Sequence, residues 1–390
     1  MYSVSSAFTS LAAQKNAEWL RSFLIGSSDY ATYVMRWPSF ENKWDAIRPS
    51  TPSVDCQNEN GEFNVFISNP TLMRSSASLR LGLQVSPSSV EWLTLFTGTL
   101  DALRFAGGGV SVTLIDKFKR LADLKIGDTT TPTAYTSSAH FIHDMAWYVC
   151  TSHGGLSATA DSSNPDLDYP SWSSWAAVFS VDNVRCSANF TGQTPLEGLK
   201  KLAELTQSAI FIQDGKITFQ RFSLVGADSA VLSNENTIDV NATLDDRMLV
   251  NKSYVSGDYD VTSKKFNITT LATDSVSVDS YGIREKLVAE NFVWLTDSIS
   301  TLNLCDRIIQ TQSEIKPRFL VKAPLDNIAI TIGDTLGFVD AQLNLNNSFR
   351  VMEEKVDMDT GAKSWVLDQT QYIGAFKLDI SALDGADILT

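Results

Sequence analysis

Short runs in which apolar and polar residues alternate occur along most of this chain, and they limit its fold more than any other feature. Two of them are "ASLRLGLQV" at residues 77–85 and "VSVTLI" at residues 110–115. An alternation with period two places every second side chain on one face, which is the pattern of an antiparallel strand with one buried face. Twenty Phe and nine Trp suit such packing, because aromatic residues favour strands. We therefore predict a mainly β protein.

Three glycine-containing segments lie between alternating runs and predict tight turns: Gly107–Gly109, Asp214-Gly215 and Thr360-Gly361. Glycine supplies the positive φ angles that short hairpin turns need. The third segment belongs to Asp359-Thr360-Gly361-Ala362, the letters that mark the catalytic aspartate of one class of acid protease. That chemistry uses two carboxylates that share one proton, and Asp-Thr-Gly occurs once in this sequence. We interpret Asp359 as a hairpin residue, and an acid protease that uses Asp359 is the weaker alternative.

The strongest helix signal is "PLEGLKKLAELT" at residues 195–206. Thr194 can cap this helix, Pro195 suits its first turn, and Glu197 can return a hydrogen bond to the cap. Four leucines then share one face. The segment therefore predicts a helix with a capping box.

Three further helices are predicted from apolar residues at helical spacing. One covers residues 7–25, and another covers residues 138–153 and ends at Gly154-Gly155. The third lies at about 297–313, and its apolar positions fall on one face: Ile299, Leu302, Cys305 and Ile309.

The order of these elements predicts a mainly β fold with an α+β insertion, in which two β-barrel-like domains are separated by an α/β domain. With 43% apolar and 19% charged residues, each domain can bury a core. Five segments are expected: an N-terminal helical arm at 1–30, a first β-barrel-like domain at 31–125, an inserted α/β domain at 126–225, a second β-barrel-like domain at 226–375 that carries the helix at about 297–313, and a C-terminal tail at 376–390.

Charge and cysteine content argue against several classes of protein. The chain has 45 acidic and 31 basic residues and a formal charge of −14, which is unsuited to gripping the phosphate backbone of nucleic acids. There is no basic and apolar leader and no uninterrupted apolar run long enough to cross a bilayer, so neither secretion nor stable membrane association is expected. The cysteines are isolated, as is typical of reduced thiols in a cytoplasm: Cys56, Cys150, Cys186 and Cys305.

Three histidines and a thiol lie close together in the sequence: His140, His143, Cys150 and His153. Imidazole and thiolate are common zinc ligands, and the pair His143-Asp144 also occurs in metal phosphohydrolases. The spacing matches no closed zinc site, and no histidine follows His153. We therefore expect polar or interfacial histidines and no metal.

An oxygen-rich loop is a second candidate for a metal site. Asp161, Asn164, Asp166 and Asp168 are near neighbours in the sequence, and calcium prefers such oxygen ligands. The loop lacks the glycine and the terminal glutamate spacing of an EF-hand. A solvated loop is the favoured interpretation.

Trp172 and Trp175 in "YPSWSSW" could stack on a sugar, but packing against a neighbouring segment is the favoured role. The sequence contains neither a G-x-x-x-x-G-K phosphate loop nor a defined Ser-His-Asp arrangement. We expect no catalytic residue, no cofactor and no enzyme activity.

Four loosely patterned stretches, which together cover most of residues 77–370, carry a resemblance to a known family. The chain resembles the baseplate hub proteins, or tail tip hub proteins, of tailed bacteriophages and related contractile machines. The stretches are "LTLFTGTLDALRF…VSVTLIDKFKRL" at 93–121, "TPLEGLKKLAELTQSAIFIQDGKITFQRF" at 194–222, "SYGIREKL…LVKAPL" at 280–325 and "ITIGDTLGF…AKSWVL" at 330–367.

This resemblance implies a structural virion protein without catalytic residues. Three subunits would form a ring in which two similar β-barrel domains of each chain alternate around the axis. Such a ring would connect the tail tube to the tail tip and surround a channel that DNA meets only in passage. The implied partners are a tail tube or distal tail protein, a tip, spike or fibre protein and a tape-measure protein. The protein would be assembled in the bacterial cytoplasm and would remain in the baseplate of the virion.

Two other functions in a phage tail remain as alternatives. A distal tail protein, which forms a hexameric ring, also begins with a barrel, so the first β domain alone does not separate it from a hub. A glycan-binding tail module would use Trp172 and Trp175 instead.

Overall fold

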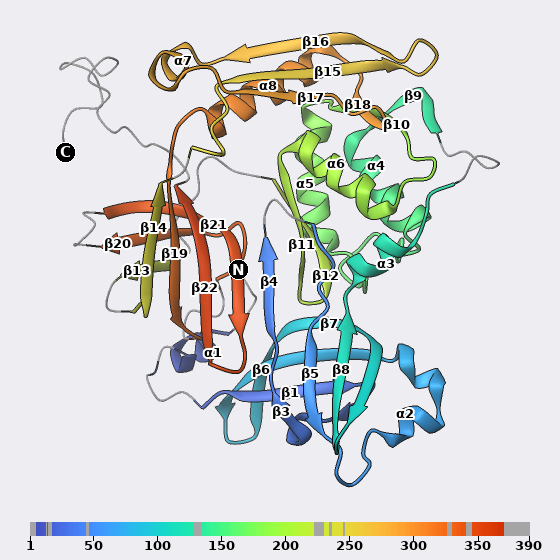
Figure 1. Ribbon diagram of the computed structural model, residues 1–390, viewed down its shortest axis with the longest axis vertical. Helices are drawn as coiled ribbons and strands as arrows, with labels where there is room; N and C mark the ends of the chain where they lie inside the picture. Colours follow the sequence, from blue (N-terminus) through green and yellow to red (C-terminus); the bar gives the residue numbers. More distant parts are fainter. Residues whose placement is uncertain are drawn as a thin grey trace.

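The computed structural model describes residues 5–369 except 13, 15–17, 44–46, 128–133, 222–229, 234–235, 245, 326–329 and 341–344. Within them, two large curled sheets are joined to a mixed α/β body and to a smaller sheet (Figure 1). The predicted fold class, mainly β with a helical insertion, is confirmed. The predicted tail at 376–390 lies outside the described residues.

The first large sheet is antiparallel and contains seven strands built from the N-terminal third of the chain. Gly107 and Gly108, with φ of 55° and 84°, form the turn of its central hairpin, and Ala106 pairs with Gly109 across it. The predicted hairpin is therefore confirmed. In spatial order the strands are β2 (Ser28–Asp29), β1 (Leu20–Ile25), β6 (Ser76–Ser86), β7 (Ser89–Ala106), β8 (Gly109–Ile115), β5 (Ser53–Gln57) and β3 (Val34–Arg36).

Short helices accompany this sheet. They are α1 (Ser6–Ala12), α2 (Asn64–Ser68) and two 3₁₀ turns at Ala31–Tyr33 and Pro70–Arg74. Residues 20–25 form strand β1, so the helix predicted over residues 7–25 is wrong beyond Ala12. The apolar residues Phe23 and Ile25 belong to the core of the first sheet. Their spacing fits a helix and a strand almost equally well, and pairing with β6 selects the strand.

The α/β body follows the first sheet along the chain. The helix α6 has the predicted capping box, because the Thr194 hydroxyl accepts from the Glu197 amide at 3.1 Å and the Glu197 carboxylate accepts from the Thr194 amide at 2.7 Å. The Asp214-Gly215 turn is also confirmed. The elements are α3 (Lys117–Asp123), β9 (Ala134–Phe141), α4 (Ile142–Tyr148) with its π-helical extension Val149–His153, α5 (Tyr169–Val181), β10 (Arg185–Asn189), α6 (Pro195–Thr206), β11 (Ser208–Gln213) and β12 (Lys216–Arg221).

The second large sheet contains six strands from residues 230–369 and one strand from the N-terminal third. β13 pairs in parallel with β20, and the other pairs are antiparallel. The strand β4 (Ser39–Lys43) pairs with β21. The remaining strands are β13 (Ala230–Ser233), β20 (Thr335–Asp340), β21 (Leu345–Asp357), β22 (Ala362–Gln369), β19 (Pro317–Pro324) and β14 (Asp239–Leu244).

A three-stranded sheet at the top of Figure 1 consists of β16 (Lys265–Thr273), β15 (Lys252–Asp260) and β17 (Glu285–Val288). The helix α7 (Ser275–Tyr281) follows β16, and α8 (Ser298–Gln312) lies against β15 and β16. β18 (Val293–Leu295) pairs with β10 of the α/β body. Buried side chains of β15, β17, β18 and α8 share one core with the α/β body. The predicted limit between the second and third domains stays a prediction, and this shared core lies on both sides of it.

The helix predicted at about 297–313 is α8, and Asp297 caps it through the amide of Ser300 at 2.7 Å. The buried face of α8 differs from the apolar face that the sequence pattern defines. Leu304, Cys305 and Ile308 are buried, whereas Ile299 and Leu302 are 71% and 42% exposed. The apolar residues of α8 therefore form a stripe that lies to one side of its buried face.

Candidate interaction site at the junction of the sheets

The strand β4 joins the two large sheets. It lies in the chain between β3 and β5, which are strands of the first sheet, yet it pairs with β21 of the second, with Phe40 opposite Val356. Just before β4, the carbonyl of Pro38 accepts a hydrogen bond from the amide of Met358 at 3.3 Å. β4 therefore belongs to the first sheet by sequence and to the second by hydrogen bonding.

Apolar packing strengthens this connection. Phe40 is 7% exposed and stacks on Phe96 of β7, with ring centroids 5.8 Å apart. Val356 near the end of β21 and Met358 just beyond it are buried in the core of the first sheet. The C-terminal sheet thus places one end of its long hairpin into the N-terminal core.

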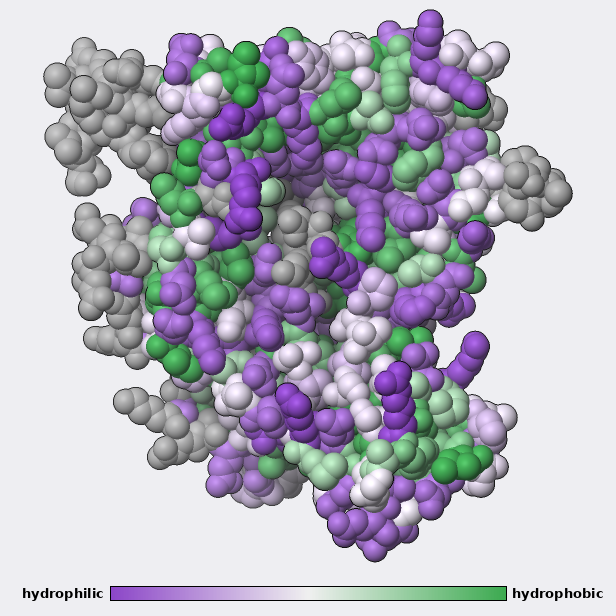
Figure 2. Space-filling model, in the orientation of Figure 1, coloured by the Kyte–Doolittle hydropathy of each residue, from purple (hydrophilic) through white to green (hydrophobic). Residues whose placement is uncertain are grey.

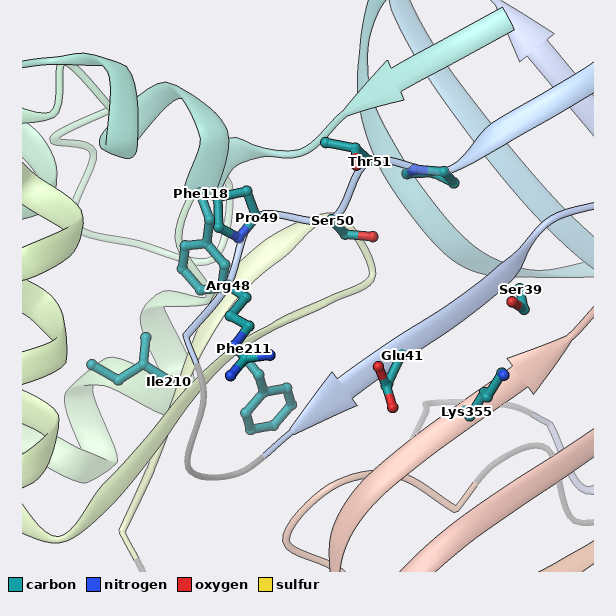
Figure 3. Close-up of a pocket in the computed structure, with 11 residues that line it drawn as sticks. Ser39, Glu41, Arg48, Pro49, Ser50, Thr51, Phe118, Ile210, Phe211 and Lys355 are labelled. Atoms are coloured by element: carbon teal, nitrogen blue, oxygen red, sulfur yellow. The ribbon is translucent and has the colours of Figure 1, made fainter. Parts of the chain in front are cut away.

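A cavity of about 300 Å³ lies beside β4, where the two large sheets and the α/β body meet. Figure 3 shows Glu41 and Lys355 on neighbouring strands at one side and Arg48 with Phe118 and Phe211 at the other. The lining residues are Ser39, Glu41, Arg48, Pro49, Ser50, Thr51, Pro52, Phe118, Ile210, Phe211 and Lys355.

The cavity has an apolar floor and a charged rim. Ile210, Phe211 and Phe118 are buried, whereas Glu41 and Arg48 are exposed. Glu41 lies directly opposite Lys355 in the register of β4 and β21. An open hollow with this rim suits contact with a polypeptide surface better than enclosure of a small molecule, since small-molecule sites are mostly enclosed and apolar.

Asp116 connects the cavity wall to α3. Its carboxylate accepts from the amide of Ser50 at 2.6 Å and, as the N-cap of α3, from the amide of Lys119 at 3.0 Å. Burial raises the pKa of this carboxyl to about 6, although the two backbone donors favour the charged form.

Asp359 lies in the turn between β21 and β22, so the predicted hairpin is confirmed. Its side chain is exposed, and Gly361 has the positive φ of 67° that the turn requires. The carboxylate of Asp357 accepts from the amides of Asp359 and Thr360 at 2.9 and 3.2 Å. Partial burial opposes ionisation of Asp357, but these hydrogen bonds outweigh it and lower its pKa. Asp359 therefore has the surroundings of a turn residue rather than of a buried acid pair.

The fold places His140 and His153 beside Tyr135, with ring centroids 5.4 and 6.0 Å from that of the tyrosine, whereas His143 lies against Phe141 and Trp172. The helix predicted over residues 138–153 is wrong before Ile142, because His140 lies on β9 and therefore does not share a helix face with His143. His153 pairs with the Tyr135 hydroxyl at 2.7 Å, and burial lowers its pKa. Cys150 is fully buried, which raises its pKa. Among the described residues, no three His, Cys, Asp or Glu side chains converge as a metal site would require.

The oxygen atoms of the 161–168 loop hold the loop itself together. The side chain of Asn164 is buried, donates to the carbonyls of Ser157 and Thr159 and accepts from the amides of Asp166 and Leu167. Asp166 forms an ion pair with Lys117 at 3.0 Å. These hydrogen bonds and this ion pair indicate that Asn164 and Asp166 stabilise the loop.

Trp175 is 2% exposed and donates through its indole nitrogen to Ser208 at 2.9 Å, which confirms its predicted packing role. Trp172 is half-buried and lies against Trp147, with ring centroids 4.6 Å apart. The two tryptophans therefore do not form one shared sugar-binding face.

Sequence reasoning missed two features of this site. The donation of β4 to a sheet of the C-terminal third follows from tertiary pairing, and Ser39–Lys43 carries no distinguishing pattern. The buried ion pair of Lys363 and Glu354, 3.1 Å apart, lies in strands whose sequences show only the ordinary alternation of apolar and polar residues.

Among the described helices, none is long and apolar enough to cross a membrane.

Comparison with known proteins relates this fold to phage tails. No protein-family model and no curated protein matches the sequence. The structure is similar to a tail protein from Neisseria meningitidis MC58, with 12% identity over 90% of this chain and 96% of that one and a TM-score of 0.57. It is also similar to the 43 kDa tail protein of prophage MuSo2 from Shewanella oneidensis, with 14% identity, coverage of 90% and 99%, and a TM-score of 0.56. The resemblance to phage tail proteins is thus confirmed at the level of the fold.

Proposed function

We propose that this chain is a structural protein of a phage-type tail and that it acts as the baseplate hub. One observation carries the proposal: the fold is shared over nearly the whole length of this chain and of two tail proteins. The match includes both large sheets and the body between them, so it concerns the complete architecture rather than one common barrel. A distal tail protein would explain the first sheet alone.

The proposed assembly is a ring of three chains. Each chain contributes two seven-stranded sheets, and alternation of the two around a three-fold axis gives six similar positions. Such a ring adapts a six-fold tail tube to a three-fold tip. The rigid connection through β4 supports this role, because it fixes the angle between the two sheets within each chain.

Open sheet edges and exposed apolar side chains support association with neighbours. β14 is an edge strand of the second sheet, and its Leu244 is 72% exposed although it lies on the core side of the strand, like Val240. Figure 2 shows further apolar groups near α7 and near α2, where Val276 is 55% and Ile67 is 63% exposed. Tube, tip and tape-measure proteins are the proposed partners.

The proposed role is that of a scaffold in the virion, without enzyme activity. With a charge of −14, the chain would line a channel that DNA crosses without adhering, since each lumen-facing cation would add a phosphate contact to break. Assembly in the host cytoplasm agrees with the four buried cysteines, all of which carry free thiols.

Electron microscopy of purified tail particles tests the proposal. We expect one ring of three copies between the tube and the tip, with the two large sheets alternating around the channel. A six-fold ring of identical positions would assign the chain to a distal tail protein instead. Absence of the chain from tail particles would contradict a structural tail role altogether.

A further inference from the structure

A second cavity, of about 310 Å³, lies where the helices α5 and α6 end beside one face of α8. Four polar residues of α8 line it: Ser300, Asn303, Arg307 and Gln310. Their spacing of three and four residues places them on one side of the helix. The lining also includes Arg221, the last residue of β12. Two different elements therefore each bring a guanidinium group to this cavity.

Arg221 is held in place and still has unused hydrogen-bond donors. Its guanidinium group lies over the ring of Phe179, 4.9 Å from the centroid, and its Nη1 donates to the carboxylate of Asp182 at 3.2 Å. Its Nε is buried and has no acceptor among the residues that the structure describes. An arginine side chain carries five N–H donors in one plane, so the bond to Asp182 leaves most of them for another acceptor.

Arg307 lies in surroundings that disfavour its own positive charge. Burial and, after it, the like charge of Arg221 lower the pKa of Arg307 to about 10, and the negative charge of Asp182 opposes this shift only in part. The two guanidinium groups repel each other across a partly dehydrated space. An anion between them would be attracted by both groups and would relieve this repulsion.

The acidic side chains of the cavity lie closer to solvent than the basic ones. The side chain of Asp182 is 40% exposed and that of its partner Arg221 is 29% exposed, while Asp306 is exposed and Arg307 is half-buried. Because water and salt screen exposed charges more than buried ones, these carboxylates weaken the attraction inside the cavity only in part. They would also repel a polyanion that has to lie across the rim, such as a nucleic acid backbone. The arrangement therefore favours a small anion.

The ends of α5 and α6 add partial negative charge, about half a charge each. Part of it is already engaged in hydrogen bonds, since the carbonyl of Phe179 accepts from the amide of Val184 at 3.0 Å and the carbonyl of Glu204 accepts from the amide of Gln207 at 3.2 Å. The two helix ends together offset about one of the two guanidinium charges. The interior of the cavity stays positive.

Two uncharged amides complete the polar lining. The side chains of Asn303 and Gln310 are exposed and hydrogen-bond to no residue that the structure describes. Each carries an NH₂ group with two donors. Both amides can therefore donate to an anion in the cavity.

We propose that this cavity binds one small oxyanion, either inorganic phosphate or a short carboxylate, between Arg221 and Arg307. Planar guanidinium groups suit such a ligand, because each can donate two parallel N–H bonds to a carboxylate or a phosphate. Asn303 and Gln310 donate further hydrogen bonds from α8. The bound anion joins the α/β body to α8, and this role does not depend on the proposed function in a tail.

Equilibrium dialysis of the isolated protein tests the site, with inorganic phosphate and glutarate as probes and with the ionic strength held constant by chloride. We expect saturable binding of one anion per chain, with a Kd of about 1 mM or below for at least one probe. Binding of phosphate alone would assign the ligand to the phosphates, and binding of glutarate alone would assign it to the carboxylates. Binding of neither probe at concentrations up to about 20 mM would overturn the proposal.

Three variants locate the bound anion, after circular dichroism has shown that each is folded. Arg307→Gln removes one guanidinium group and should raise the Kd at least about tenfold. Gln310→Glu, at an exposed position of the same wall, adds a negative charge and should raise it about threefold or more, so it decides the question even if Arg307→Gln does not fold. Gln57→Glu, the same substitution at an exposed position on β5, is the matched control and should bind like the wild type.

Two results of these measurements would contradict the cavity as a site for small anions. An equal Kd of Gln310→Glu and Gln57→Glu would place the bound anion elsewhere on the chain. Tighter binding of polyglutamate than of glutarate would assign the cavity to an acidic polypeptide. Either result would leave the proposed tail role intact.

Discussion

At the scale of single residues, the second large sheet contains a buried ion pair. Lys363 on β22 is fully buried, and its ammonium group lies 3.1 Å from the carboxylate of Glu354, also buried, and donates to the carbonyl of Ile330. The ring of Trp365 lies 5.7 Å away. Burial lowers the pKa of Lys363, and the negative charge of Glu354 opposes that shift. Such pairs are costly to break because the remaining charge stays buried.

We expect Lys363→Met to lower the free energy of unfolding by about 3–5 kcal/mol, since it removes the ammonium group that lies against the buried Glu354 carboxylate. The double variant Lys363→Met/Glu354→Leu should recover a large part of the loss. Urea unfolding of the two variants and the wild type measures both effects. Equal stability of the single and double variants would show that the pair is not coupled.

Asp116 provides a pH-dependent test. Its pKa in the folded protein is about 6, above the value of an exposed aspartate, so the folded state binds the proton more tightly. The contribution to stability is complete below pH 3.8 and is lost as the pH rises through 6. The always neutral variant Asp116→Asn should therefore gain stability relative to the wild type between pH 4 and pH 7, by up to about 3 kcal/mol. A stability difference that does not change with pH would contradict this.

Among the elements, β4 determines how the two halves of the chain are joined. Its pairing with β21 and the stacking of Phe40 on Phe96 connect residues that are far apart in the sequence. The cavity lined by Glu41, Arg48 and Lys355 lies beside this connection. Loosening β4 should therefore affect both large sheets together.

Phe40→Ala is expected to lower the free energy of unfolding by about 3–5 kcal/mol, because it leaves a cavity in the first core. It should also expose the 47–52 segment to limited proteolysis. Ser39→Ala, one residue away at an exposed position, is the matched control and should change stability by less than about 0.5 kcal/mol. A similar effect of both variants would contradict the role assigned to β4.

Local elements could be predicted from the sequence wherever the signal lies within a few residues. The capping box of Thr194 and Glu197 and the turns at Gly107, Asp214 and Gly361 needed no distant partner. Where a feature depends on pairing between distant segments, the prediction was wrong or the feature was missed. Residues 20–25 became a strand through β6, and β4 joined another sheet. Candidate sites followed the same rule, since the turn role of Asp359 was predictable and the junction cavity was not.

The helix α8 shows that an apolar face predicted from the sequence can differ from the face that is buried in the single chain. Ile299, Leu302, Cys305 and Ile309 share one face by sequence, as predicted, but only Cys305 is buried in the single chain. The apolar pattern identifies residues that share a face of the helix, and it does not say which part of that face the chain's own core covers.

At the scale of the whole molecule, the chain is strongly acidic, with a formal charge of −14. The excess of 45 acidic over 31 basic residues predicts that the protein does not retain duplex DNA, even at low salt where weak contacts are strongest. A gel-shift measurement at low ionic strength should show no complex. A clear shift that disappears with added salt would contradict a non-adhesive channel.

The native mass of the purified assembly tests the central claim most directly. One chain has a mass of 42.8 kDa, and sedimentation equilibrium clearly separates three times this mass from a single chain and from a ring of six chains. We expect the three-chain mass, stable over at least a tenfold range of concentration. A six-chain ring, or a single chain at every concentration and in every tail particle, would contradict the assignment of this protein as a trimeric hub.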